Sequence, residues 1–162
     1  MAGNKPSDSF IDLYYEDVPV GVEFDTSGHT VTQRDILLFA DVTRDHHPLH
    51  TDEEFCRSTE FGRPIAHGLY GLSLMEGLKA SSKLYEHTSV ASLGWNNVRF
   101  LKPVFPGDTV RVRVRFTHKR ESRNPGRGVV TEMLYLINQK DEVVTEAEHV
   151  TLLLRRQAGE AS

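Results

Sequence analysis

Residues 68–84 read GLYGLSLMEGLKASSKL, a run that is apolar on nearly every side and carries small residues at positions 68, 71, 73 and 77. A helix with apolar residues all round is typical of a buried helix. Its glycines would let another backbone come close, at a cost of up to about 1 kcal/mol each relative to alanine. The stretch therefore predicts a buried central helix.

Four strand-like segments follow this helix, and turns rich in Pro, Gly, Asn and Asp separate them. The segments are Ala91–Leu101, Asp108–Arg120, Gly128–Gln139 and Val143–Leu154. One buried helix followed by four antiparallel strands predicts an α+β domain in which a curved antiparallel sheet wraps the helix.

Short elements are predicted before the central helix. Residues 22–32 alternate weakly around a Ser-Gly pair, which indicates a short hairpin or a strand leading into a turn. Thr32 followed by Asp35 is typical of a helix start, and apolar residues then recur at helical spacing. This helix should end near Arg44, because Pro48 disfavours helical geometry in the residue before it.

A second short helix is predicted to begin at Asp52, run through Phe55 and end before Gly62. Residues 45–51 would then form a loop between the two helices. These seven residues contain one aspartate and three of the eight histidines of the chain.

The composition is that of one ordinary globular domain of 162 residues. We expect a core over about residues 12–155 and loosely held ends, residues 1 to about 12 and 157–162. Apolar residues make up 38% and charged residues 26%, and 19 Lys and Arg against 23 Asp and Glu give a net charge of −4. That balance argues against nucleic acid as a partner bound over the whole surface.

Membrane insertion is not expected, because no apolar run approaches the roughly 18 residues that a span requires. The first residues also lack the apolar core of a signal peptide. Cys56 is the only cysteine, which excludes an intrachain disulfide and a cysteine-rich zinc site. We therefore expect a cytoplasmic protein in which Cys56 is a small buried residue rather than a nucleophile.

The segments DVTRDHHPLHTD (41–52) and FGRPIAHG (61–68) hold the residues best suited to chemistry. Asp45 and His50 lie five residues apart across Pro48, a spacing that lets a loop bring both side chains to one point. A carboxylate beside an imidazole suits proton transfer at neutral pH. The alternative is a pair that caps helices or faces solvent. A metal site is not expected, because adjacent histidines in an extended loop point apart.

These motifs resemble the MaoC-like acyl dehydratases, which include the (R)-specific enoyl-CoA hydratases. The resemblance rests on DHHPLH (45–50), then FGRPIAHG (61–68) opening an apolar helix, and FLKPVFPGD (100–108). It extends over residues 22–154, and it implies a single hot-dog domain.

The same resemblance implies an enzyme that reversibly hydrates a trans-2-enoyl-CoA to a 3-hydroxyacyl-CoA. Asp45 and His50 would be the catalytic pair that activates water. The backbone N–H of Gly68 would bind the thioester oxygen, a role that a helix N-terminus supports because its free N–H groups carry positive potential.

Two residues depart from the family pattern, which often has Gly before the catalytic acid and Asn two residues after it. Arg44 and His47 occupy these positions. Arg44 would pair with a carboxylate on the substrate, such as that of mesaconyl-CoA, or stabilise the Asp45 carboxylate. His47 would replace the amide as an orienting donor, and we assign His67 to the same group of orienting or substrate-selecting residues.

Three more residues, Ile65, Tyr70 and Leu74, are candidates to line an acyl pocket, although core packing explains them equally well. No metal or redox cofactor is expected, because the thioester itself makes the β-carbon electrophilic; coenzyme A is the handle of the substrate. We expect a homodimer or dimer-based oligomer. The alternative functions are a hot-dog acyl-CoA thioesterase and a non-catalytic acyl-thioester binding module.

Overall fold

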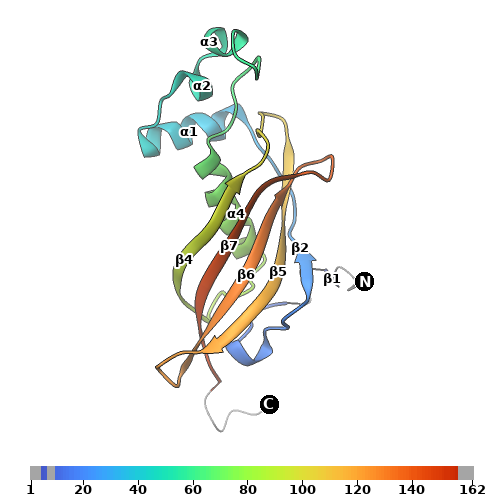
Figure 1. Ribbon diagram of the computed structural model, residues 1–162, viewed down its shortest axis with the longest axis vertical. Helices are drawn as coiled ribbons and strands as arrows, with labels where there is room; N and C mark the ends of the chain where they lie inside the picture. Colours follow the sequence, from blue (N-terminus) through green and yellow to red (C-terminus); the bar gives the residue numbers. More distant parts are fainter. Residues whose placement is uncertain (1–4, 7–9, 157–162) are drawn as a thin grey trace.

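A computed structural model describes residues 5–6 and 10–156 of the chain, and Figure 1 shows a curved sheet with one long helix against it. The strands follow the order β1-β2-β5-β6-β7-β4, and β3 also pairs with β5. The elements are β1 Lys5–Pro6, η2 Tyr15–Asp17, β2 Glu23–Asp25, β3 His29–Thr30, α1 Gln33–Thr43, α2 Pro48–Thr51, α3 Glu53–Arg57, α4 Gly68–Ser81, β4 Ser89–Phe100, β5 Thr109–Glu121, β6 Arg127–Ile137 and β7 Val143–Leu154.

The four long strands confirm the α+β prediction, with ends within two residues of those expected. Strands β5, β6 and β7 pair antiparallel in chain order, whereas β4 pairs with β7 at the edge of the sheet. The valines of β5 that alternate with arginines, such as Val112 and Val114, are fully buried. Because successive side chains of a strand point to opposite faces of the sheet, the alternation of valine with arginine places the valines on the face that meets the core.

The predicted central helix is α4, which packs against the sheet through one face. Gly71, Met75 and Leu78 on that face are buried, whereas Leu69 is 60% exposed. The expectation of burial on all sides is therefore wrong for the described chain, because the sheet covers only one side of the helix. The helix also ends three residues before the predicted Leu84.

The helix predicted after Thr32 is confirmed as α1, and Thr32 and Asp35 form a reciprocal capping box. The hairpin reading of residues 22–32 is wrong, because β2 and β3 both pair with β5 rather than with each other. Residues 45–51 are also not all loop. Pro48 begins the short helix α2, since its fixed φ suits the first helical position.

The N-terminal stretch is anchored more firmly than expected. Phe10 is only 6% exposed, and its ring packs on those of Phe24 and Phe116. Lys5–Pro6 pairs in parallel with β2. The remainder of the predicted loose ends, residues 1–4, 7–9 and 157–162, lies outside the described residues.

A buried polar cluster joins the C-terminal half of α4 to the sheet. Lys79 Nζ lies 3.0 Å from Glu132 Oε2, 2.7 Å from His149 Nδ1 and 3.1 Å from an oxygen of the half-exposed Glu76. Burial alone would raise the pKa of Glu132, but Lys79, His149 and the hydroxyl donated by Tyr85 lower it to about 2. Glu132 is therefore an ionised carboxylate in the core.

Among the described helices, none is both long and apolar enough to cross a membrane. Cys56 is fully buried, and burial raises the pKa of its thiol. This agrees with the expected role of Cys56 as a small core residue.

Candidate functional site

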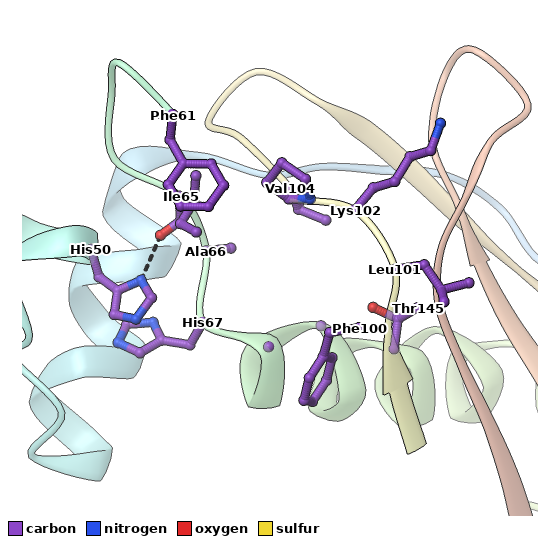
Figure 2. Close-up of a pocket in the computed structure, with 13 residues that line it drawn as sticks. His50, Phe61, Ile65, Ala66, His67, Phe100, Leu101, Lys102, Val104 and Thr145 are labelled. Carbon is purple, nitrogen blue, oxygen red and sulfur yellow. Dashed lines mark hydrogen bonds between the residues drawn. The ribbon is translucent and has the colours of Figure 1, made fainter. Parts of the chain in front are cut away.

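Two cavities meet at the N-terminal end of α4, where α1, α2 and α3 lie beyond one end of the sheet (Figure 1). The larger, of about 360 Å³, lies between α4 and the chain that leaves β4 (Figure 2). The smaller, of about 320 Å³, contains Asp45. Both are lined by His50, His67, Gly68 and Phe100. We call them the larger and the smaller cavity.

The ends of two helices position Asp45. Arg44 adopts a left-handed conformation with φ 66°, which ends α1 and turns the chain toward the site. His47 then caps α2, because its ring Nδ1 accepts the N–H of Leu49 at 3.1 Å. The backbone N–H of His47 donates to Asp45 Oδ1 at 3.3 Å. The orienting donor at this position is thus the backbone, and the imidazole serves the helix cap.

His50 is held in one tautomer by the motif that follows it. Its Nδ1 lies 2.8 Å from the carbonyl oxygen of Ile65, so Nδ1 carries the hydrogen and donates it. Nε2 is left with a free lone pair. Burial lowers the pKa of His50 below 6.5, only partly offset by the bond to Ile65. Half-buried His50 is therefore a neutral base near pH 7.

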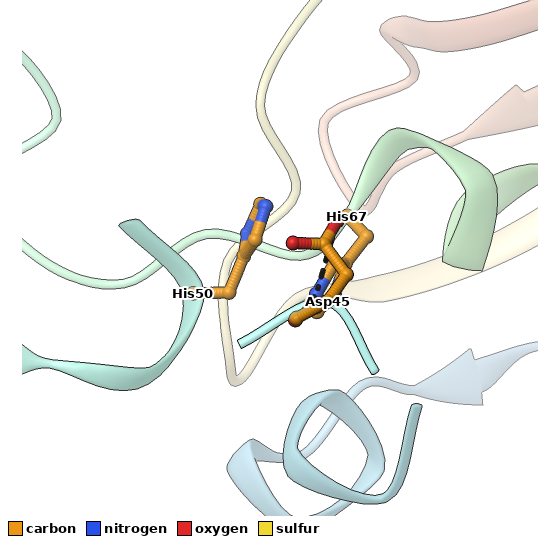
Figure 3. Close-up of side chains that lie close together, drawn as sticks. All are labelled: Asp45, His50 and His67. Carbon is orange, nitrogen blue, oxygen red and sulfur yellow. Dashed lines mark hydrogen bonds and ion pairs between the residues drawn. The ribbon is translucent and has the colours of Figure 1, made fainter. Parts of the chain in front are cut away.

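His67 connects the two candidate catalytic residues (Figure 3). Its ring stacks on that of His50, with centroids 3.7 Å apart and planes 27° apart. Its Nε2 donates to the carbonyl oxygen of Asp45 at 2.9 Å and lies 3.9 Å from Asp45 Oδ2. His67 is 4% exposed, and its Nδ1 has no hydrogen-bond partner within the part of the chain that the structure describes. The residue thus fixes the relative positions of Asp45 and His50.

Asp45, His50 and His67 also have the donor atoms of a metal site, since one such atom from each lies within 4.8 Å of the others. A ring nitrogen, however, directs its lone pair within the ring plane. The two planes are nearly parallel, so these lone pairs do not converge on one ion. The arrangement fits proton transfer through His50 better than joint coordination of a metal.

The N-terminus of α4 lies at both cavities, because its first residue, Gly68, lines each of them. Within the described part of the chain, the N-cap residue His67 makes no side-chain hydrogen bond to this helix end. A Cβ atom at Gly68 would lie 2.9 Å from three ring atoms of Phe100, closer than side chains pack. A larger residue at position 68 would therefore require the ring of Phe100, which is 52% exposed, to shift. The free N–H groups of a helix N-terminus carry positive potential, which suits an oxygen that gains negative charge.

The other predicted site residues are not all brought together. Ile65 lines the larger cavity, but Tyr70 and Leu74 line neither cavity in the described chain. Their assignment to an acyl pocket stays a prediction. Each lies one position, about 100° of helical rotation, from the face formed by Gly71 and Met75. Tyr70 instead packs edge-on against the ring of Phe39, and burial raises its pKa to about 12.

Arg44 is exposed and lines neither cavity, so the geometry lends no support to its pairing with a substrate carboxylate. The sequence reasoning also missed the cavity residues Phe61, Phe100 and Thr145. For Phe100 a signal was present, because it opens the FLKPVFPGD segment that resembles the MaoC-like proteins.

Comparison with known proteins identifies relatives of this chain. The family model described as a MaoC like domain matches residues 17–135. Protein MaoC of Klebsiella aerogenes is 33% identical over 106 residues, 65% of this chain, but the match spans only 31% of that longer protein. A 3-hydroxybutyryl-CoA dehydratase of Methylorubrum extorquens is 31% identical over 136 residues, 84% of this chain and 81% of the relative.

Solved structures give the same picture. The (R)-hydratase from A. caviae is 28% identical, with a TM-score of 0.71 over 84% of this chain and 97% of that chain. A Mycobacterium tuberculosis protein described as having a double hotdog fold matches 93% of this chain and 46% of its own, with a TM-score of 0.78 and 23% identity. The curved sheet around α4 is therefore a hot-dog fold, as predicted.

Proposed function

Because this chain belongs to the MaoC-like dehydratase family, we propose that it reversibly hydrates a trans-2-enoyl-CoA to a 3-hydroxyacyl-CoA. The observation that carries the proposal is the fixed tautomer of His50. His50 keeps Nε2 unprotonated, a ring nitrogen of His50 lies within 4.8 Å of a carboxylate oxygen of Asp45, and Gly68 lines the same cavity. A base, a carboxyl group and an oxyanion donor are the groups that such an addition needs.

In the proposed reaction, His50 Nε2 takes a proton from the attacking water, and the resulting hydroxide bonds to the β-carbon. Asp45 orients that water, receives from His50 the proton that His50 took from it, and gives this proton to the α-carbon. Both residues return to their starting state, and the sum is one water added across the double bond. Dehydration follows the same steps in reverse.

Negative charge develops on the thioester oxygen as the β-carbon is attacked. The Gly68 N–H at the start of α4 would donate to this oxygen, supported by the positive potential of the helix N-terminus. A donor of this kind contributes roughly 3 kcal/mol of transition-state stabilisation. The proposed reaction needs no metal or redox cofactor, since the thioester activates the β-carbon and coenzyme A serves as the handle.

The pH dependence of kcat/KM tests the role of His50. The base must be neutral, and the lowered pKa keeps it neutral down to a pH below the ordinary value of 6.5. We expect kcat/KM to be constant near pH 7 and to fall on the acid side with a midpoint below 6.5. An acid limb centred at or above 6.5 would contradict the assigned environment. His46→Ala, which removes an exposed histidine, should leave this limb in place.

We also propose that the chain forms a homodimer or a dimer-based oligomer through β4. Among the described strands, β4 pairs only with β7, and its other edge is left open. Apolar side chains on it are exposed, including Leu93 at 51% and Phe100 at 52%. An open apolar edge favours pairing with another strand. Sedimentation at micromolar concentration should give at least twice 18.3 kDa, and a single 18.3 kDa species would contradict it.

A further inference from the structure

The lining of the larger cavity includes a hydroxyl group that has no hydrogen-bond partner among the described residues. Thr145, on β7, is 3% exposed, and Figure 2 shows its side chain among the residues that line this cavity. Its strand neighbours are Phe100 on β4 and Leu136 on β6. On α4, a Cβ atom added at Gly71 would lie 3.5 Å from Thr145 Oγ1. Carbon atoms thus dominate the surroundings of this hydroxyl.

Each of the other polar side chains of the larger cavity makes at least one polar interaction. His50 and His67 belong to the proposed catalytic cluster, and Lys102 pairs with Glu142 at 2.6 Å. Thr145 Oγ1 makes no hydrogen bond to another of the residues in 5–6 and 10–156. This hydroxyl faces the cavity, so a ligand that fills the cavity must either form a hydrogen bond with it or leave it unpaired, which is unfavourable.

The helix geometry places this hydroxyl beyond the reacting atoms. Gly71 lies three residues after Gly68, which is about 4.5 Å further along α4. A short acyl chain whose thioester oxygen accepts the Gly68 N–H, and which extends into the larger cavity, would bring its distal atoms beside Thr145. Apolar walls that include Phe61, Ile65 and Val104 would enclose the rest of the chain.

We propose that Thr145 selects a short trans-2-enoyl-CoA that carries a hydroxyl or carbonyl oxygen near the distal end of its acyl chain. The threonine hydroxyl is both donor and acceptor, so it can pair with either group. A plain hydrocarbon chain would leave the buried hydroxyl unpaired and bind the transition state less well. This inference rests on the proposed hydratase function and adds a substrate class to it.

The test compares substrates that differ only in a terminal hydroxyl or methyl group. The pairs are 4-hydroxybut-2-enoyl-CoA with pent-2-enoyl-CoA, and 5-hydroxypent-2-enoyl-CoA with hex-2-enoyl-CoA, all in the trans form. The parent protein should favour the hydroxylated member of at least one pair by about tenfold in kcat/KM. Thr145→Val, which keeps the shape and removes the hydroxyl, should abolish that preference, and Thr145→Ser should retain it.

A parent that favours the hydrocarbon member of both pairs would overturn the proposal. So would a Thr145→Val variant that changes both members of the preferred pair by the same factor. Failure of the hydratase function would appear separately, as no turnover of any of the four compounds. The preference is then measured by calorimetry with 4-hydroxybutanoyl-CoA and pentanoyl-CoA, and with 5-hydroxypentanoyl-CoA and hexanoyl-CoA. Equal affinities within both pairs would overturn the role of Thr145.

Discussion

Asp45→Asn and His50→Ala should each lower kcat for enoyl-CoA hydration by about 10²- to 10⁴-fold, the range that general acid–base groups contribute. Asparagine keeps the shape of Asp45 and the acceptor for the His47 N–H, but it cannot give a proton to the α-carbon. Alanine at position 50 removes the proposed base, the imidazole whose Nδ1 donates to Ile65 and whose Nε2 is therefore unprotonated. For Asp45→Asn the KM should change much less than kcat, because asparagine keeps the shape of the side chain that lines the smaller cavity.

Matched controls lie close to the pair. Asp41 and His46 are exposed residues that pair with each other at 3.6 Å, and they line neither cavity. Asp41→Asn and His46→Ala therefore repeat the two chemical changes outside the site, and turnover should stay within about twofold of the parent. Initial rates at saturating substrate give the comparison. Turnover of Asp45→Asn or His50→Ala within a few-fold of the parent would refute the assigned roles.

Lys79→Met should lower the free energy of unfolding by about 3–5 kcal/mol, the usual cost of removing one partner from a buried ion pair. The substitution leaves the Glu132 carboxylate fully buried without its closest cation, 3.0 Å away. Met matches the stem of Lys in length, so packing should change little. Urea denaturation at a fixed protein concentration measures the difference.

Lys83→Met provides the control, because this lysine is 63% exposed, follows α4 directly and pairs only loosely with Glu86 at 3.7 Å. It should change stability by less than about 0.5 kcal/mol. The double variant Lys79→Met/Glu132→Met should recover much of the loss, since neither charge then stays buried alone. A loss below about 1 kcal/mol for Lys79→Met would mean that the cluster is not a buried ion pair.

What the sequence predicts well is local in the chain. The five-residue spacing of Asp45 and His50 across Pro48 brings both side chains to one site, as expected, because the turn between them is short. The start of α1 follows from Thr32 and Asp35, which interact within one helical turn. The alternation along β5 likewise separates the two faces of the sheet without any knowledge of its neighbours.

What the sequence does not reveal depends on distant pairing. Lys79 contacts Glu132 and His149, which follow it in the chain by 53 and 70 positions. Nothing near Lys79 in the sequence indicates these partners. Thr145 reaches the cavity only because the register of β7 sets it opposite Phe100. The orientation of α4 is a further example, since Gly71 lines the larger cavity while the neighbouring Tyr70 lines neither, and an apolar helix gives little sign of which side meets a cavity.

The central claim is tested most directly by the ultraviolet absorbance of the conjugated enoyl thioester when purified protein is mixed with short trans-2-enoyl-CoA substrates, beginning with crotonyl-CoA. A thiol-reactive dye is read in a parallel sample. Hydration by Asp45 and His50 predicts loss of the enoyl absorbance without free thiol, and no such loss with Asp45→Asn. Release of thiol would identify a thioesterase. Unchanged absorbance with every short enoyl-CoA, hydroxylated ones included, would contradict the hydratase assignment.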